Sequence, residues 1–276
     1  MKTICLYFEI HQITHLKRYR FFDIGTDHYY YDDYANERTI AYTAEHSYMP
    51  ALTTLLEMIR QNPGYFKVAF SISGVGMEQL EDHAPQVISL LQELNETGQV
   101  EFLTEPYSHG LAGLANEESF KRDIEKMSAK IESCFGKRPT VMRNSSLIYT
   151  DEIGEQVASL GYKGMLTEGA KHVLGWKSPH YVYNCNMAPG LKLLLRDVNA
   201  SDDISLRFSN TRHHILESNL RFRFERRRSD THGQHDTITL GRIVGHRIGT
   251  DRRRVVLTLQ IKQTKLLPSR QILVAD

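Results

Sequence analysis

Residues 140–149 read TVMRNSSLIY, and this stretch carries the local pattern from which the rest of the fold can be predicted. Thr140–Met142 is a short β-capable run, Asn144–Ser146 is a polar turn, and a helical pattern covers Thr150–Leu160. Strand, loop and helix in this order are typical of α/β proteins, whose catalytic side chains lie on the loop after a strand. The alternative is that Asn144–Ser146 only caps the following helix, because Asn and Ser are common capping residues.

The length of 276 residues is enough for one large α/β domain or two small ones with a substantial core. The apolar run at the N-terminus is too short, and too soon followed by charge, for a signal peptide or a membrane span. We therefore expect a cytoplasmic protein that contacts no membrane. Cys5, Cys134 and Cys185 have no metal-type spacing, so we expect reduced thiols.

The charge balance of the chain changes near Asn210. Residues 1–210 contain 20 Lys and Arg against 27 Asp and Glu, whereas residues 211–276 contain 14 against 6. Phe222 and Phe224 are the only aromatic residues after Asn210. The two parts of the chain therefore differ in character.

Strand-like apolar runs alternate with amphipathic helical patterns over most of residues 1–210. We expect strands at Ile4–Ile10, Phe66–Ser73, Val100–Leu103, Thr140–Met142 and Gly164–Thr167. We expect helices at Tyr48–Ile59, Pro85–Leu94, Glu117–Phe135 and Thr150–Leu160. This alternation predicts parallel strands with helices that cover them.

Polar residues collect after the expected strands, at His11, Gln12, Glu78, Glu105, His109, Asn144–Ser146, Glu168 and His172. Parallel strands would bring them to one rim of a barrel, although loops are rich in polar residues even without a site. His11 and His109 with Glu9 or Glu105 could also hold a metal. No histidine pair at short helical spacing supports a metal site, so we do not favour it.

The segments Tyr19–Gly25 and His28–Tyr34 combine aromatic rings, histidine and carboxylates within a few turns. Sugar sites use this mixture, because aromatic faces stack on pyranose rings while polar groups bind the hydroxyls. A tyrosine-rich surface loop or a protein contact would explain the composition equally well.

Several segments together resemble the α-amylases of glycoside hydrolase family 57. They are FEIHQ at 8–12, RYRFFD at 18–23, HYYYDD at 28–33, FSISG at 70–74, RN at 143–144 with LIY at 147–149, GMLTEGAKHVLGW at 164–176, and SDDI at 201–204 with RFSN at 207–210. The resemblance covers about residues 1–210, and we identify no match after them.

The resemblance implies an α/β fold, an incomplete and truncated (β/α)7 barrel over residues 1–210, and a retaining hydrolase that uses no cofactor. Its substrate or ligand would be an α-1,4-glucan such as starch, glycogen or a maltooligosaccharide. A retaining mechanism uses two carboxyl groups about 5–5.5 Å apart, one as nucleophile and one as acid/base. The resemblance also implies a set of glucan-binding residues, namely His11, Gln12, Glu78, His109 and Trp176.

Two departures from the family concern catalysis. Catalytic members resembling this sequence read Arg-Asn-Thr-Glu-Leu-Ile-Tyr where this chain has residues 143–149, and their Glu is the nucleophile. Ser146 stands at that position, and a serine without an adjacent strong base is a poor nucleophile toward an acetal carbon. The acid/base Asp of the family follows a later strand, and we find no such segment after Asn210. We therefore expect impaired or absent hydrolysis.

Residues 211–276 allow two interpretations. The arginine clusters at 221–228 and 252–254 suit phosphates, so one interpretation is a polyanion-binding tail. The other, which we favour, is a foreign or out-of-frame sequence, because the change is abrupt and falls inside a motif-bearing domain. We expect an irregular, basic, poorly packed tail that binds no nucleic acid and leaves the last barrel strands unformed, although Val255–Ile261 could form a strand.

Three functional hypotheses follow. The first is an α-amylase-like protein with impaired hydrolysis, and the second is a non-catalytic glucan-binding or regulatory pseudoenzyme. The third is a carbohydrate deacetylase, which would require a metal. Metal analysis would distinguish the third, and glucan binding with or without turnover would distinguish the first two. The oligomeric state is open.

Overall fold

The computed structural model describes residues 3–205 and 254–260, and the account below is limited to them. These ranges contain eight β-strands. The strands are β1 (Thr3–Ile10), β2 (Val68–Ile72), β3 (Val100–Leu103), β4 (Val141–Arg143), β5 (Gly164–Thr167), β6 (Val182–Asn184), β7 (Lys192–Leu195) and β8 (Arg254–Gln260).

The strands form two four-stranded sheets, ordered β3-β2-β1-β8 and β4-β5-β7-β6. A parallel bridge between Thr104 and Met142 joins the end of β3 to β4, and β7 contacts β8 on the other side. All neighbouring strands are parallel except β6, which pairs antiparallel with β7. Seven parallel strands thus form an incomplete barrel, and the expected α/β fold class is confirmed.

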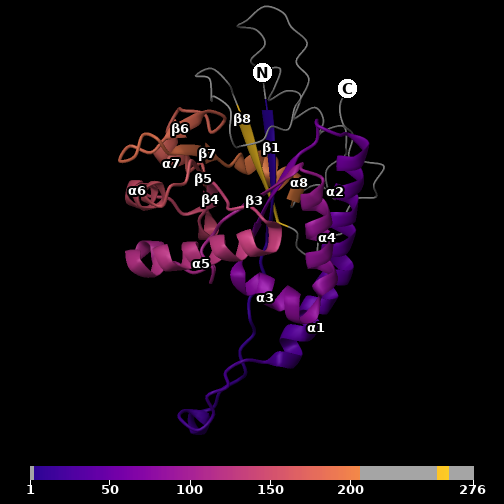
Figure 1. Ribbon diagram of the computed structural model, residues 1–276. Coiled ribbons are helices and arrows are strands. Elements are labelled where there is room, and N and C mark those ends of the chain that lie inside the picture. The colour runs from indigo at the N-terminus through magenta and orange to yellow at the C-terminus, as the bar shows by residue number, and fades with distance from the viewer. Residues whose placement is uncertain (1–2, 206–253, 261–276) are drawn as a thin grey trace, which may run out of the picture.

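Helices cover the outside of the strands. They are α1 (Asp33–Thr43), α2 (Met49–Gln61), α3 (Gly74–His83), α4 (Pro85–Glu96), α5 (Glu117–Phe135), α6 (Asp151–Ser159), α7 (Lys171–Leu174) and α8 (Val198–Ser205), with a π-helical segment η2 (Ala44–Tyr48) and the 3-10 turns η1 (Phe21–Asp23), η3 (Ala112–Leu114) and η4 (Ser145–Leu147). Figure 1 shows α1 to α4 together on one side and α6 and α7 on the other, while α5 lies across the front.

Side chains of the strands alternate between the barrel interior and the surrounding helices. The inner core contains Cys5, Tyr7, Ala69, Leu103, Val141, Leu147, Leu166 and Leu194. The outer faces belong to two larger clusters, one that includes Phe70 and Phe102 and one that includes Met142 and Met165. Burial on both faces is typical of parallel strands, and each buried Leu or Phe contributes about 1.5–3 kcal/mol.

Most of the expected elements occur where the sequence pattern placed them. The bounds of β3, β5 and α5 agree with the expected ranges, and α5 ends at Gly136 in a left-handed conformation with φ 73°. Thr150 accepts the Ile153 N–H and so caps α6. The helix α1 and the strands β6 and β7 are additions that the periodicity did not indicate.

The strand β8 corrects one expectation about the C-terminal segment. Arg254–Gln260 pairs in parallel with β1 from Thr3↔Arg254 to Glu9↔Gln260. The strand anticipated at Val255–Ile261 is therefore confirmed, and the expectation that this segment leaves the last barrel strand unformed is wrong for these residues. Residues 206–253 and 261–276 lie outside the described residues, so the boundary at 210 and the poor packing of 211–276 stay predictions. None of the described helices has the length and apolar character that a membrane crossing requires.

Candidate functional site at the carboxyl ends of the strands

The inward-facing side chains change from apolar to polar just before the strands end. On β1 the inward-facing residue after Tyr7 is Glu9. On β2, on β4 and at the end of β3 an inward-facing apolar residue is likewise followed by a polar one. Because successive inward positions are two residues apart, a polar layer lies on the apolar core at the rim where active sites of parallel barrels lie. This layer comprises the buried residues Glu9, Ser71, Glu105 and Arg143.

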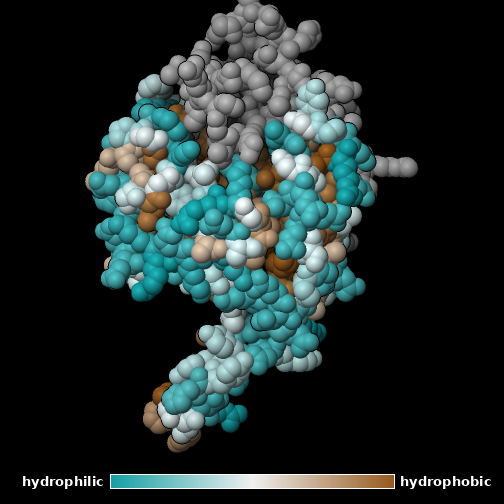
Figure 2. Space-filling view, viewed as in Figure 1, coloured by the Kyte–Doolittle hydropathy of each residue, from teal (hydrophilic) through white to brown (hydrophobic). Residues whose placement is uncertain are grey.

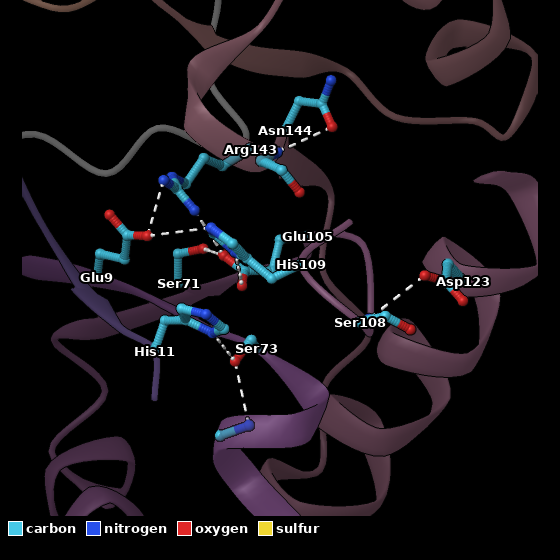
Figure 3. A network of polar contacts seen from close by, with 12 residues as sticks. Glu9, His11, Ser71, Ser73, Glu105, Ser108, His109, Asp123, Arg143 and Asn144 are labelled. Atoms are coloured by element: carbon cyan, nitrogen blue, oxygen red, sulfur yellow. Dashed lines mark hydrogen bonds and ion pairs between the residues drawn. The ribbon is translucent and has the colours of Figure 1, made fainter. Parts of the chain in front are cut away.

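Arg143 is the centre of this layer, and Figure 3 shows it between two carboxylates. Its side chain is 2% exposed, and its terminal nitrogens lie 3.0 Å from Glu9 Oε1 and 2.8 Å from Glu105 Oε2. The Ser71 hydroxyl donates to the same Glu105 oxygen. Burial of an ion costs several kcal/mol unless partners with good geometry offset the cost. The network therefore holds the rim rigidly.

The charges of this network support one another. Burial alone would raise the pKa of Glu105, but the hydrogen bond with His109, the charge of Arg143 and the hydrogen bond from Ser71 together lower it below its usual value. Burial alone would lower the pKa of Arg143, but the carboxylates of Glu105 and Glu9 raise it. At neutral pH, Glu105 and Arg143 are therefore both ionised.

Two stacked imidazoles lie beside this network. His109 Nδ1 is 3.1 Å from Glu105 Oε1, and His109 Nε2 is 3.7 Å from Glu9 Oε1. The rings of His11 and His109 stack with centroids 4.0 Å apart and planes 18° apart, and Figure 3 shows both at the same network. The structure thus brings together two of the predicted site residues, which come from the loops after β1 and β3.

His11 is held as a neutral imidazole. Its Nδ1 lies 2.7 Å from Ser73 Oγ, which already accepts the Gly76 N–H at 3.1 Å. Ser73 can therefore donate its hydroxyl proton to Nδ1, so that His11 Nε2 carries the hydrogen and can donate to a ligand. Burial first, and then the neighbouring His109, lower the pKa of His11 from 6.5 to about 4.

This environment predicts the titration of His11. Its imidazole signal in an NMR titration should show a midpoint near pH 4 rather than 6.5. Between pH 6.5 and 4 the unfolded chain binds a proton that folded His11 does not, so stability should fall as the pH falls through this window.

The His11→Gln variant assigns the signal and should show a smaller pH dependence of the unfolding free energy in that window. Ser73→Ala should leave the midpoint below 6.5, because burial is the leading cause of the shift. A midpoint at or above 6.5 in the unaltered chain would contradict the neutral assignment.

Three of the described residues other than glycine have positive φ angles, and all three lie at the rim. They are His109 at 52°, Ser146 at 52° and Leu147 at 56°. Left-handed backbone costs energy for residues other than glycine, and it persists where surrounding contacts enforce it, often at functional sites. The loops after β3 and β4 are therefore fixed in conformations that their own residues do not favour.

Ser146 lies exposed on the loop after β4, between two buried neighbours. Asn144 anchors this loop, because its side-chain oxygen accepts the Ser145 N–H at 2.9 Å and its amide donates to the Ile148 carbonyl at 3.0 Å. In the part of the chain that the structure describes, no hydrogen bond joins the Ser146 hydroxyl to a histidine or a carboxylate. Nothing described there would activate this hydroxyl as a nucleophile.

The other three predicted glucan-binding residues are Glu78, Gln12 and Trp176. Glu78 contacts the Tyr107 hydroxyl and lies 3.9 Å from Lys126 Nζ. The Gln12 carbonyl accepts a hydrogen bond from the side chain of Gln79 at 3.0 Å. Trp176 follows α7 on the loop after β5 and is 94% exposed, so it is available for stacking. A glucan-binding role for these residues stays a prediction.

A second ionic group follows β5 and β7. Arg196 lies 3.4 Å from Glu168 Oε2 and 2.7 Å from Asp202 Oδ1. The Glu168 N–H donates to the Leu147 carbonyl at 3.1 Å, which ties this group to the Ser146 loop. Glu168 is therefore the carboxylate residue whose backbone the structure brings beside that loop, whereas the Asp151 side chain binds Tyr149 and Asn186.

The residues considered for a metal do not form a ligand set. Within residues 3–205 and 254–260 there is no group of three or more His, Cys, Asp and Glu side chains that could hold a metal ion. Glu9 and Glu105, the carboxylates of that hypothesis, both bind the Arg143 guanidinium instead.

Arg143, the central residue, is not among the site residues predicted from the sequence. A signal for it was present, because Arg143 lies two residues after Val141 and so points to the same face of its strand. Parallel strands are buried on both faces, and a charge that points inward there needs buried partners. The alternation of Ser71 and Ser73 with buried apolar residues carried the same information.

The chain is similar to known proteins over most of its length. A model of glycosyl hydrolase family 57 matches residues 5–261, so the similarity continues past residue 210, where we placed its end, and includes β8. A curated protein of Methanocaldococcus jannaschii, named "Putative alpha-amylase", is 38% identical over 181 residues, which are 65% of this chain and 38% of that protein. The chain thus spans well under half the length of that relative.

Two solved structures share the fold. A 4-α-glucanotransferase from Thermococcus litoralis superposes with a TM-score of 0.65 and 13% identity, over 97% of this chain and 34% of that one. A family 57 branching enzyme from Thermococcus kodakaraensis gives a TM-score of 0.60 and 12% identity, over 96% of this chain and 64% of that one. At these identities the likeness concerns the fold alone.

Proposed function

We propose, from the premise that the chain belongs to glycosyl hydrolase family 57, that it binds α-1,4-glucans at the rim formed by His11 and His109 and hydrolyses them at most at a trace rate. The observation that carries the proposal is a rigid, preformed polar rim beside an exposed serine. The rim supports ligand binding, and Ser146 lacks the carboxylate that a retaining mechanism requires.

The rim supplies the groups that a sugar needs. His11 Nε2 can donate to a hydroxyl, while Glu105 and Arg143 hold the stacked partner His109 in place. Because these groups are fixed by buried contacts before a ligand arrives, little entropy is lost in ordering them on binding. Exposed Trp176 adds an apolar ring at the same end of the barrel, where a pyranose face could stack.

The alternative is a glucan-binding or regulatory pseudoenzyme with no turnover at all. It is favoured by the serine at the nucleophile position together with the ionic network of Arg143, Glu9 and Glu105 below it. Binding can survive the loss, because hydroxyl contacts and stacking do not involve the nucleophile.

Glucan binding is the decisive measurement. Calorimetry with maltoheptaose should show binding by the unaltered chain and none with cellohexaose, whose β-linkages present the rings differently. Trp176→Ala should weaken binding about 2–10-fold, as expected for one stacking contact.

The matched control is Tyr65→Ala. Tyr65 is also exposed, at 69%, but it precedes β2 and so lies at the opposite end of the barrel. Its loss should leave the affinity unchanged. Absence of maltoheptaose binding at millimolar concentration would refute the proposal, and equal effects of the two substitutions would remove Trp176 from the site.

A further inference from the structure

The most exposed feature outside the rim is an arm formed by residues 13–32, which follows β1. Figure 1 shows it extending away from the barrel below α1 and α3. The arm is folded upon itself, with the Lys17 N–H donating to the Tyr30 carbonyl at 2.8 Å and the Asp32 N–H donating to the His15 carbonyl at 3.0 Å. Its two limbs also share an antiparallel bridge between Leu16 and Tyr31.

Hydrogen bonds and a ring contact also hold the end of the arm together. The Tyr19 hydroxyl lies 3.0 Å from the Asp27 carbonyl oxygen and 3.1 Å from that of Tyr29, and the rings of Tyr19 and Tyr30 stack at 5.1 Å. The Arg20 N–H donates to Asp23 at 2.8 Å and fixes the turn. The end of the arm therefore has a defined shape without support from the barrel.

This defined shape presents apolar side chains to solvent. Phe21, Phe22 and Ile24 are 81%, 85% and 70% exposed. Figure 2 shows a hydrophobic end on this otherwise polar projection. An apolar patch with a polar surround is typical of a protein interaction site, and phenylalanine is enriched at such sites.

Charge is segregated between the two limbs of the arm. Residues 13–22 contain Lys17, Arg18 and Arg20 and no acidic residue, whereas residues 23–32 contain three aspartates and no Lys or Arg. Lys17 and Asp27 lie 3.6 Å apart within one arm and remain 39% and 47% exposed, so their charges are still accessible. Each arm thus carries a cationic limb and an acidic limb on either side of its apolar end.

We propose that this arm is a self-association surface whose partner is the arm of a second copy of the chain. A two-fold axis brings identical surfaces together, so a surface must be complementary to itself. When only the ends of two such arms overlap antiparallel, Phe21, Phe22 and Ile24 of both meet near the axis, and the cationic limb of one faces the acidic limb of the other beside them. A neutral glucan has no charges to match the cationic and acidic limbs, whereas a second arm has both. The inference does not depend on the proposed function.

The test measures association of the full chain by sedimentation equilibrium. We expect a dimer whose dissociation constant rises at least about tenfold in Phe21→Ser/Phe22→Ser and in Arg18→Glu/Arg20→Glu, because either the apolar or the charged part is lost. Tyr65→Ser, at an exposed aromatic residue remote from the arm, should dimerise like the unaltered chain. Unchanged thermal unfolding of the arm variants would show that the barrel is intact.

A cysteine cross-link locates the contact independently. Phe22→Cys should form a disulfide-linked dimer on mild oxidation, and Tyr65→Cys should show only the background from the natural cysteines. The proposal would be overturned if the unaltered chain were monomeric at about 100 μM, or if both arm variants dimerised as tightly as the unaltered chain. A monomer that binds glycogen more weakly after Phe21→Ser/Phe22→Ser would also overturn it, because the arm would then be a sugar-binding surface.

Discussion

Purified chain incubated with maltoheptaose should release reducing ends at a rate on the order of 10⁴–10⁶-fold below that of a family member with Glu at the nucleophile position, the usual cost of losing one member of a catalytic unit. Double displacement at an acetal carbon requires a carboxylate to form the glycosyl-enzyme. Ser146 has a left-handed backbone, is exposed, and receives no activating hydrogen bond from a described histidine or carboxylate.

The Ser146→Glu variant separates the nucleophile from the acid/base. It should not recover full activity on maltoheptaose, because no acid/base Asp is recognisable in this sequence. It should nevertheless react with α-maltosyl fluoride, whose leaving group needs no proton, and form a covalent maltosyl adduct detectable by mass spectrometry. Ser146→Gln, of the same size but without the charge, should form no adduct. Full activity on maltoheptaose should require both the Glu and a family-like C-terminal segment.

Robust turnover by the unaltered chain would contradict this prediction and point to another carboxylate. Glu168 is then the first residue to test, because its backbone N–H bonds to the carbonyl next to Ser146. Loss of that activity in Glu168→Gln, with retained activity in Asp151→Asn, would identify it.

Replacement of Arg143 by methionine should lower the free energy of unfolding by about 3–5 kcal/mol, the usual cost of removing one partner from a buried ion pair. The guanidinium is 2% exposed and binds Glu9 and Glu105, which are 6% and 0% exposed, so both carboxylates would remain buried without their cation. Urea unfolding at neutral pH measures the difference. Combining Arg143→Met with Glu9→Gln and Glu105→Gln should recover part of the lost unfolding free energy.

Arg138 provides a matched control. It also contacts two carboxylates, Glu125 at 2.5 Å and Glu132 at 3.5 Å, but its side chain is 49% exposed. Arg138→Met should therefore cost only about 0–1 kcal/mol. Equal losses for the two arginine variants would show that Arg143 contributes no more than a surface ion pair.

The pH dependence of the Arg143→Met effect follows from the same network. In the unaltered chain the lowered pKa of Glu105 contributes stability above its unfolded value, and this is lost as the pH falls through the folded value. Without the cation, burial would raise that pKa instead. The cost of Arg143→Met should therefore shrink as the pH is lowered from 7 to 5, because Glu105 can then become neutral.

The sequence predicts the regular elements well where one periodic signal is long. The bounds of α5 could be predicted from the sequence, because apolar residues recur on one face and a glycine follows. These residues are Phe120, Ile124, Met127 and Ile131. In contrast, α1 buries only Asn36, Ile40 and Thr43, so its apolar signal is weak. The strand β6 has three residues and none of them is buried, so it carries no apolar signal, whereas the buried run Leu193–Leu195 of β7 was a signal that was left unused.

The site could be predicted as a location but not as a set of contacts. Parallel strands end at one rim, which is why His11 and His109 could be expected together. The position of Glu78 depends on a packing detail that no pattern shows. The Tyr107 ring lies where a Cβ at residue 74 would be, so only glycine lets that ring approach, and its hydroxyl then binds the Glu78 carboxylate.

The pairing of β1 with β8 determines when the barrel can be completed. Arg254 pairs with Thr3, so β1 lacks one of its two neighbours until synthesis has passed Arg254–Gln260. At about 5–20 residues per second, synthesis of the intervening chain takes roughly 10–50 s, during which one edge of β1 has no ladder partner. An unpaired edge strand can join another chain, and pairing over such a sequence separation is slow. Yield during expression should therefore depend on how β1 is protected before Arg254–Gln260 is made.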